Sequence, residues 1–157
     1  MINTPILYQW NTVWVESECA WFSILWALLR MKPDTDYIKI GKEIIAEDWN
    51  SMGFMRAINW FIKKGYVKGY KKCIYTPFIS KKYPIITTLY SVDWIETWKP
   101  PYKLTYKPKG TWGAHLVCVD SPWKIVNSYG ESFGDKWYFY FTPDQVKTFG
   151  QCFYLVI

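Results

Sequence analysis

The stretch ESECAWFSILWALLR, residues 16–30, predicts a helix that begins near Cys19. The acidic residues Glu16 and Glu18 stand where the positive end of the helix dipole favours negative charge, and Ser17 is a candidate N-cap. Pro33 ends the helix. The apolar run inside it is 11 residues long, from Cys19 to Leu29. It therefore falls short of the roughly 18 residues that crossing a bilayer requires.

Two more helices are predicted in the first half of the chain. The first covers DTDYIKIGKEIIAED, residues 34–48, and the second covers NSMGFMRAINWFIKKG, residues 50–65. Asn50 or Ser51 is expected to begin the latter helix and Gly65 to end it. The first half of the chain is therefore predicted to be helical.

The second half is rich in residues that favour strands. Runs of this kind occupy residues 83–91, 113–120, 123–129, 136–142 and 151–157, and turn residues separate them. A short helix is expected at TPDQVKTF, residues 142–149, because Thr142 can cap it and Pro143 suits its first position. Helices followed by an antiparallel sheet indicate an α+β fold. The natural cleft of such a fold lies where a helix end meets the sheet.

Composition and charge limit the function classes. The chain has 157 residues, half of them apolar, with 11 Trp, 13 Tyr and 9 Phe, which predicts one packed domain over residues 1–157. The formal charge is +6, but the lysines are dispersed in pairs and Arg30 and Arg56 are the only arginines. We therefore expect no specific nucleic-acid partner and no membrane span. Weak attraction to a polyanion or an anionic surface stays open.

Neither a secretory signal nor a metal-binding motif is evident. Residues 1–10, MINTPILYQW, lack the basic and apolar segments of a signal peptide, so we expect a cytoplasmic or virion-associated protein. The four cysteines lie far apart without a CxxC pair. Free thiols are expected, with no zinc site and no dense disulfide framework. We expect no metal or organic cofactor.

Cys19 and His115 are candidates for nucleophilic catalysis. Cys19 falls at a predicted helix N-terminus, which stabilises an anion and is expected to lower the pKa of a thiol. His115 is the only histidine and opens the strand-like run GAHLVCVD, residues 113–120. Any imidazole that activates Cys19 must therefore be His115. The alternatives are a buried thiol and a strand-end histidine bonded to a backbone carbonyl.

A third motif, NSYGESFGDKWYFYF at residues 127–141, completes a pattern. Together with ECAWFS around Cys19 and AHLV around His115, it resembles the papain-like cysteine peptidases. That family has a cysteine on the first helix, a histidine opening a strand and an asparagine at the end of the next strand. The resemblance implies a Cys19, His115 and Asn127 triad, in which Asn127 orients the imidazole. Tyr129 stands where the family's commonest version has tryptophan, and it is either a cover for that hydrogen bond or an ordinary core aromatic.

The resemblance extends along the chain, with one departure. Residues 50–66 resemble the family's glycine-bearing helix beside the substrate groove, which implies that Gly53 contacts substrate. The family's oxyanion glutamine stands six residues before the cysteine, where this chain has Val13. Gln9 is our choice for that role and Asn11 the alternative, with the backbone N–H of Cys19 as the second donor.

The resemblance implies a thiol protease, a hydrolase that cleaves amide bonds of a peptide or protein substrate through an acyl-enzyme at Cys19. Two alternatives stay open. One is a CHAP-type cell-wall amidase or endopeptidase, because the stretch ECAWFS also fits the cysteine motif of that class. The other is an inactive structural or binding module with the same fold. The short chain, rich in lysine and tryptophan, would suit a phage, viral or bacterial accessory protein and a component of a larger viral assembly.

Overall fold

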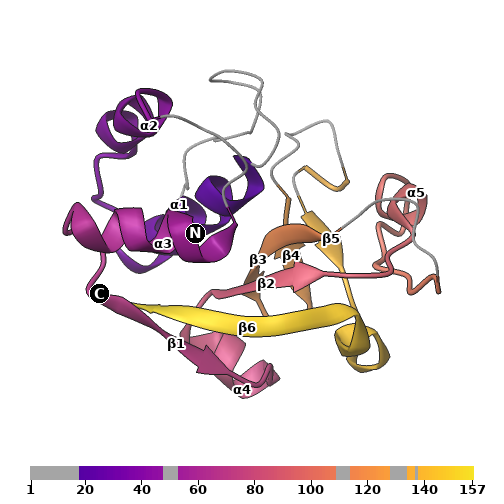
Figure 1. Cartoon of the computed structure of the whole chain (residues 1–157). Coiled ribbons are helices and arrows are strands. Elements are labelled where there is room, and N and C mark those ends of the chain that lie inside the picture. Colours follow the sequence, from indigo (N-terminus) through magenta and orange to yellow (C-terminus); the bar gives the residue numbers. More distant parts are fainter. Residues whose placement is uncertain (1–17, 48–52, 109–113, 128–133, 137) are drawn as a thin grey trace.

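Three long helices come first in the chain and gather on one side of the molecule (Figure 1). The structure is a computed structural model that describes residues 18–47, 53–108, 114–127, 134–136 and 138–157. The long helices are α1 (Glu18–Met31), α2 (Tyr37–Ile45) and α3 (Phe54–Lys63). Shorter elements follow between the strands: α4 (Pro77–Lys82), α5 (Trp94–Thr97) and a 3-10 helix, η2 (Pro143–Thr148).

A six-stranded antiparallel sheet packs against these helices in the described part of the chain. Its strand order is β1-β6-β2-β3-β4-β5, so β1 and β5 are the edges. The strands are β1 (Gly69–Cys73), β2 (Ile85–Leu89), β3 (His115–Ser121), β4 (Lys124–Val126), β5 (Tyr138–Tyr140) and β6 (Phe149–Val156). The predicted α+β fold, helical first and an antiparallel sheet afterwards, is confirmed.

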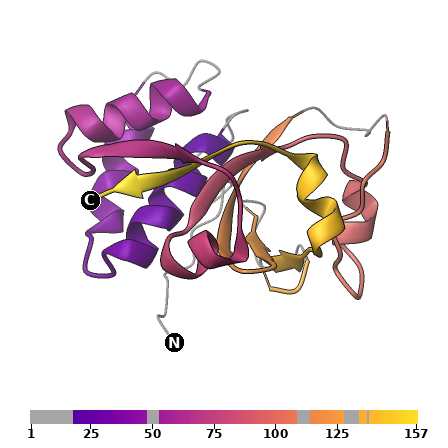
Figure 2. The same ribbon diagram turned by 90° about the horizontal axis from the view of Figure 1, so that it is seen from below.

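Strand β3 lies between two apolar cores, because successive side chains of a strand point to opposite faces. Leu116 and Cys118 join the core built with α1, α2 and α3. Val117 and Val119 join a second core on the opposite face of the sheet. Figure 2 shows the three long helices on one side and α5 and η2 at the far end. Both faces of β3 are therefore shielded from water.

Helix α3 begins later than the sequence predicted. Gly53 is its N-cap, with φ −68° and ψ 172°, and Phe54 is its first helical residue. The start expected at Asn50 or Ser51 is therefore wrong, because the extended backbone of Gly53 interrupts a helix on its N-terminal side. The other end agrees with the prediction. Gly65 follows the helix with φ +78°, a left-handed conformation that only glycine adopts without strain.

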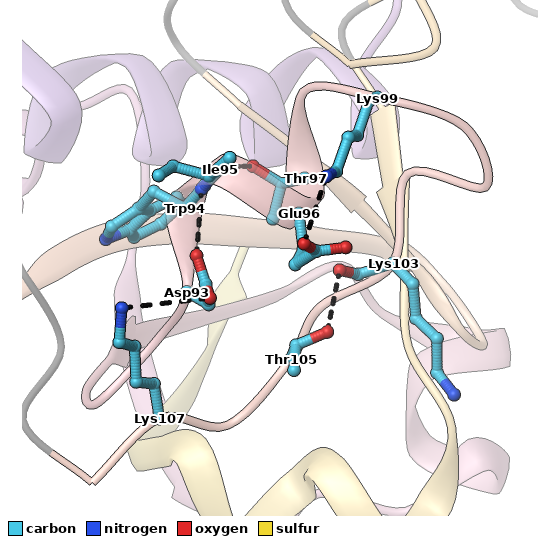
Figure 3. Close-up of polar contacts among 9 residues, drawn as sticks. All are labelled: Asp93, Trp94, Ile95, Glu96, Thr97, Lys99, Lys103, Thr105 and Lys107. Atoms are coloured by element: carbon cyan, nitrogen blue, oxygen red, sulfur yellow. Dashed lines mark hydrogen bonds and ion pairs between the residues drawn. The ribbon is translucent and has the colours of Figure 1, made fainter.

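Three elements were absent from the prediction: β1, α4 and α5. Helices α4 and α5 are short and depend on their caps. Thr76 Oγ1 accepts a hydrogen bond from Ile79 N at 3.1 Å, and Asp93 Oδ1 accepts one from Ile95 N at 3.2 Å (Figure 3). The short helix expected at residues 142–149 is the 3-10 helix η2. None of the helices in the described segments is long and apolar enough to cross a membrane.

Candidate active site

Cys19 lies in the first turn of α1, and α1 is held in register with β3. Every side chain from Ala20 to Leu29 is buried. Ser23 Oγ donates a hydrogen bond to the carbonyl oxygen of Leu116 at 3.3 Å, and Trp26 Nε1 donates to Asp120 Oδ1 at 2.8 Å. The two bonds show that α1 and β3 run in the same direction. The N-terminal turn of α1 therefore lies beside the start of β3.

The Cys19 thiol faces β3, because residues four apart share one face of a helix and Ser23 faces that strand. Burial raises the pKa of this thiol, and hydrogen bonds with the backbone of Leu116, Ala20 and Cys19 itself offset only part of the effect. The lowered pKa expected from the helix N-terminus is therefore wrong. Desolvation of the thiolate outweighs the backbone groups that stabilise it.

His115 is the first residue of β3 and is only 7% exposed. It stands opposite Leu89 in the ladder with β2. Its Nε2 atom lies 3.0 Å from Asn127 Oδ1, and Asn127 follows directly on the last residue of β4. Because β3 and β4 are antiparallel neighbours joined by a tight turn, the start of β3 and the end of β4 lie side by side at the same end of the two strands. The sheet therefore brings these two side chains together.

The bond to Asn127 decides which imidazole nitrogen carries the proton. An amide oxygen only accepts hydrogen bonds, so Nε2 carries the proton and Nδ1 keeps its lone pair. Burial lowers the pKa of His115 to about 4, and the hydrogen bond with Asn127 counteracts that shift in part. His115 is therefore a neutral imidazole at pH 7, with Nδ1 as a proton acceptor.

Trp94 packs against His115, a contact that the sequence analysis missed. The two ring centroids are 5.2 Å apart and the rings are nearly perpendicular, at 85°. Trp94 is 2% exposed and opens α5, which Asp93 caps (Figure 3). The only signal in the sequence was the cap in VDWIET, residues 92–97. The indole limits the movement of the imidazole and excludes water from it.

The sequence-predicted residues are thus partly assembled. His115 and Asn127 are in contact, and Cys19 lies against Leu116, the residue next to His115. Gly53 is exposed at the start of α3, and a methyl group added to it would meet nothing within 4 Å. The two candidate oxyanion donors, Gln9 and Asn11, lie outside the described residues, as does Tyr129.

The described residues contain no group of three or more His, Cys, Asp or Glu side chains that could hold a metal ion. All four cysteines are free thiols, and Cys118 and Cys152 are buried. The expectation of free cysteines is confirmed. The chemistry available where β3 starts and β4 ends is that of a thiol, a neutral imidazole and an amide.

Comparison with known proteins gives a structural likeness. No family model and no curated protein sequence matches the chain. Solved structures do match, among them the bromelain protease from Ananas comosus in complex with the E64 inhibitor. The TM-score is 0.62 at 14% identity, over 98% of this chain and 94% of that chain. The chain therefore has the papain-like fold, and this degree of identity shows the fold alone.

Proposed function

We propose that this chain is a cysteine peptidase, one domain over residues 1–157, that cleaves amide bonds in peptides or proteins. The observation that carries the proposal is the buried hydrogen bond between His115 Nε2 and Asn127 Oδ1, placed beside the helix turn that holds Cys19. A polar pair of this kind orients an imidazole, and Nδ1, the nitrogen without a proton, then serves as a base for the thiol. The papain-like fold supports the same proposal.

The first half of the reaction forms an acyl-enzyme. Because burial raises the pKa of Cys19 and lowers that of His115, the resting pair is a neutral thiol and a neutral imidazole. As the sulfur attacks the substrate carbonyl carbon, the thiol proton moves to His115 Nδ1. The imidazolium then gives this proton to the leaving amine while the C–N bond breaks. A thioester on Cys19 and a free amine remain.

The second half hydrolyses the thioester. His115 takes a proton from a water molecule, which attacks the thioester carbon, and the same proton returns to the Cys19 sulfur as the acid product leaves. Negative charge forms on the carbonyl oxygen in both halves. We assign its stabilisation to the backbone N–H of Cys19 and to Gln9, with Gly53 leaving space for substrate along α3.

A second candidate function has support from the same site. His115 is 7% exposed and burial shifts both pKa values against the thiolate–imidazolium pair. A structural or binding module that has kept the papain-like fold without its chemistry would show the same burial. The papain-like fold accommodates both candidates, so activity decides between them.

The test uses purified chain with casein as a protein substrate and bacterial cell wall as the alternative. Under the peptidase proposal, casein is cleaved, Cys19→Ala abolishes cleavage, and E64 inhibits the wild type. Cys152→Ala is the matched control, because it removes a different thiol and should leave turnover intact. Cleavage of cell wall alone would indicate the CHAP-type alternative. A folded wild type that cleaves neither substrate would support the binding module.

A further inference from the structure

The turn from β1 to α4 exposes two large apolar side chains between four lysines. Ile74 is 84% exposed and Phe78 is 81% exposed, more than any other large hydrophobic residue that the structure describes. Lys71 and Lys72 precede them on β1, and Lys81 and Lys82 follow on α4; all four side chains are exposed. We call these six residues the corner patch. Ile74 and Phe78 are four residues apart at the same turn of the chain, and exposed apolar side chains that lie together mark a binding surface.

The backbone holds the corner patch in a defined shape. Thr76 caps α4 and Pro77 opens it, which fixes where the chain turns. Phe78, Lys81 and Lys82 then share one face of the helix, at spacings of three and four residues. An aromatic stack joins the end of α4 to the sheet next to β1. Lys71 stands opposite Tyr154 in the sheet, and Tyr154 stacks on Tyr83 at the end of α4 with 4.4 Å between ring centroids.

The charge of the corner patch is not neutralised. Residues 49–92 contain no Asp or Glu. Within the described chain, none of the four lysines lies within 4.0 Å of a carboxylate oxygen. The lysines around α5 differ, because Lys99 pairs with Glu96 at 3.3 Å and Lys107 approaches Asp93 at 4.0 Å (Figure 3). The corner patch is therefore positive, with an apolar centre.

We propose that the corner patch binds the surface of an anionic phospholipid bilayer. Ile74 and Phe78 enter the interface between headgroups and acyl chains, and the lysines beside them contact the lipid phosphates and carboxylates. Lys71 and Lys72 do so from opposite faces of the edge strand β1, because they are successive residues of that strand. Apolar side chains combined with nearby lysines are the two components of reversible membrane binding, which requires no spanning helix.

The chemistry of the corner patch favours lipid over nucleic acid. Single-stranded nucleic acid is bound by aromatic rings that stack on bases, and Phe78 is the only exposed aromatic side chain of the corner patch. Ile74 has no ring to offer a base. The corner patch also has no arginine, the residue that reads guanine and phosphate with two hydrogen bonds.

The corner patch lies far from the candidate active site, at the other end of α1. Lys81 and Lys82 line a pocket with Arg30 at the C-terminal end of α1 and Asp120 near the end of β3. The Asp120 carboxylate is paired there with Arg30 at 2.8 Å. Cys19 and His115 lie at the opposite ends of these elements, and Arg30 follows Cys19 by eleven residue steps along the helix, about 16 Å. Membrane binding thus leaves the Cys19 region open, and the proposal does not depend on catalysis.

The experiment measures co-sedimentation of the purified chain with large unilamellar vesicles of phosphatidylcholine, with and without phosphatidylserine. We expect binding to the anionic vesicles only, weakened strongly between about 50 mM and about 500 mM salt because exposed charges are then screened. The double variant Ile74→Ser/Phe78→Ser should lose at least about tenfold in affinity. Lys81→Gln/Lys82→Gln should lose about fivefold for each lysine removed.

Matched controls separate the corner patch from the rest of the surface. Ile95 is 59% exposed on α5, and Lys99 and Lys103 are exposed lysines nearby. Ile95→Ser and Lys99→Gln/Lys103→Gln make the same chemical changes there and should leave vesicle affinity unchanged. Cys19→Ala should bind vesicles as the wild type does. A loss in Cys19→Ala would overturn the claim that the two sites are independent.

Other outcomes would overturn the proposal itself. These are equal binding to neutral and anionic vesicles, no binding to either, or equal losses in the α5 control variants. Binding to a single-stranded oligonucleotide that the corner-patch variants abolish, without vesicle binding, would assign the surface to nucleic acid. Circular dichroism checks the fold of each variant. Casein cleavage by the corner-patch variants in the absence of vesicles should equal that of the wild type, so the peptidase proposal can fail or stand separately.

Discussion

Asn127 Oδ1 accepts a hydrogen bond from His115 Nε2 over 3.0 Å, and the two side chains are 3% and 7% exposed. They come from two strand ends that only the pairing of β3 with β4 brings together. Because little water reaches the bond, it holds the imidazole in one orientation and one tautomer. The chemistry proposed for Cys19 depends on that orientation.

Removal of the two partners should have graded effects on peptide hydrolysis. His115→Ala removes the base and should lower kcat/KM about as much as Cys19→Ala, because the two residues act as one unit. Asn127→Ala leaves the base in place and should cost about 10- to 100-fold, the range found when a metal-bound histidine loses the partner that orients it. Steady-state kinetics on a fluorogenic peptide measure both. An Asn127→Ala loss as large as that of His115→Ala, with the fold intact, would contradict the orienting role.

The buried imidazole should make the fold sensitive to acid. The pKa of His115 is lowered from 6.5 to about 4 by burial, so between these values only the unfolded chain takes up a proton. This contribution to stability is fully present above pH 6.5 and is lost as the pH falls toward 4, by about 3 kcal/mol in all. Urea unfolding at pH 7 and pH 4.5 measures it. His115→Gln should lose less stability over that interval; equal losses would refute the assignment.

The Cys19 thiol should react slowly with iodoacetamide at mildly acidic pH. Burial raises its pKa, so little thiolate is present at pH 6 and the labelling rate should still be rising at pH 9. Mass spectrometry after labelling at several pH values identifies the modified cysteine. A rate that is already maximal at pH 6 would show a thiolate–imidazolium pair in the free protein, and His115→Ala would then remove that reactivity.

Trp94 should control the protonation of His115. Trp94→Ala leaves a cavity beside the ring and should destabilise the fold by about 3 to 5 kcal/mol. Water then reaches the imidazole, so its pKa should rise toward 6.5. Because His115 is the only histidine, its ring protons give a single NMR titration curve. Trp94→Phe, which keeps an aromatic ring, is the control and should leave the pKa near 4. An unchanged pKa in folded Trp94→Ala would exclude this role.

The oxyanion donor is tested by two substitutions in the segment before Cys19. If Gln9 donates to the carbonyl oxygen, Gln9→Ala should lower kcat by about two to three orders of magnitude, the usual cost of losing one such donor. Asn11→Ala should then have little effect, and single-turnover kinetics with a peptide ester separate this step from release. The reverse pattern would move the role to Asn11. No loss in either variant would leave backbone N–H groups as the donors.

The sequence predicted those elements whose residues carry strong local signals. The apolar run before Pro33 predicted α1, and β-branched and aromatic runs predicted β2 through β6. Strand β1 was missed because GYKKC, residues 69–73, is an edge strand with exposed lysines and therefore lacks the alternation of a half-buried strand. Helix α5 is four residues long, too short for any helical period to appear.

The candidate site, too, was predicted only in part from the sequence. Local composition predicted that Cys19 begins a helix and His115 begins a strand, because turn and cap residues mark where elements begin and end. The resemblance to the papain-like peptidases added Asn127 and the order of the three residues. The direction of the pKa shift at Cys19 and the packing of Trp94 on His115 could not. Both depend on how much water is excluded when α1, α5 and the sheet come together. Desolvation is a property of long-range packing, and no short stretch of sequence determines it.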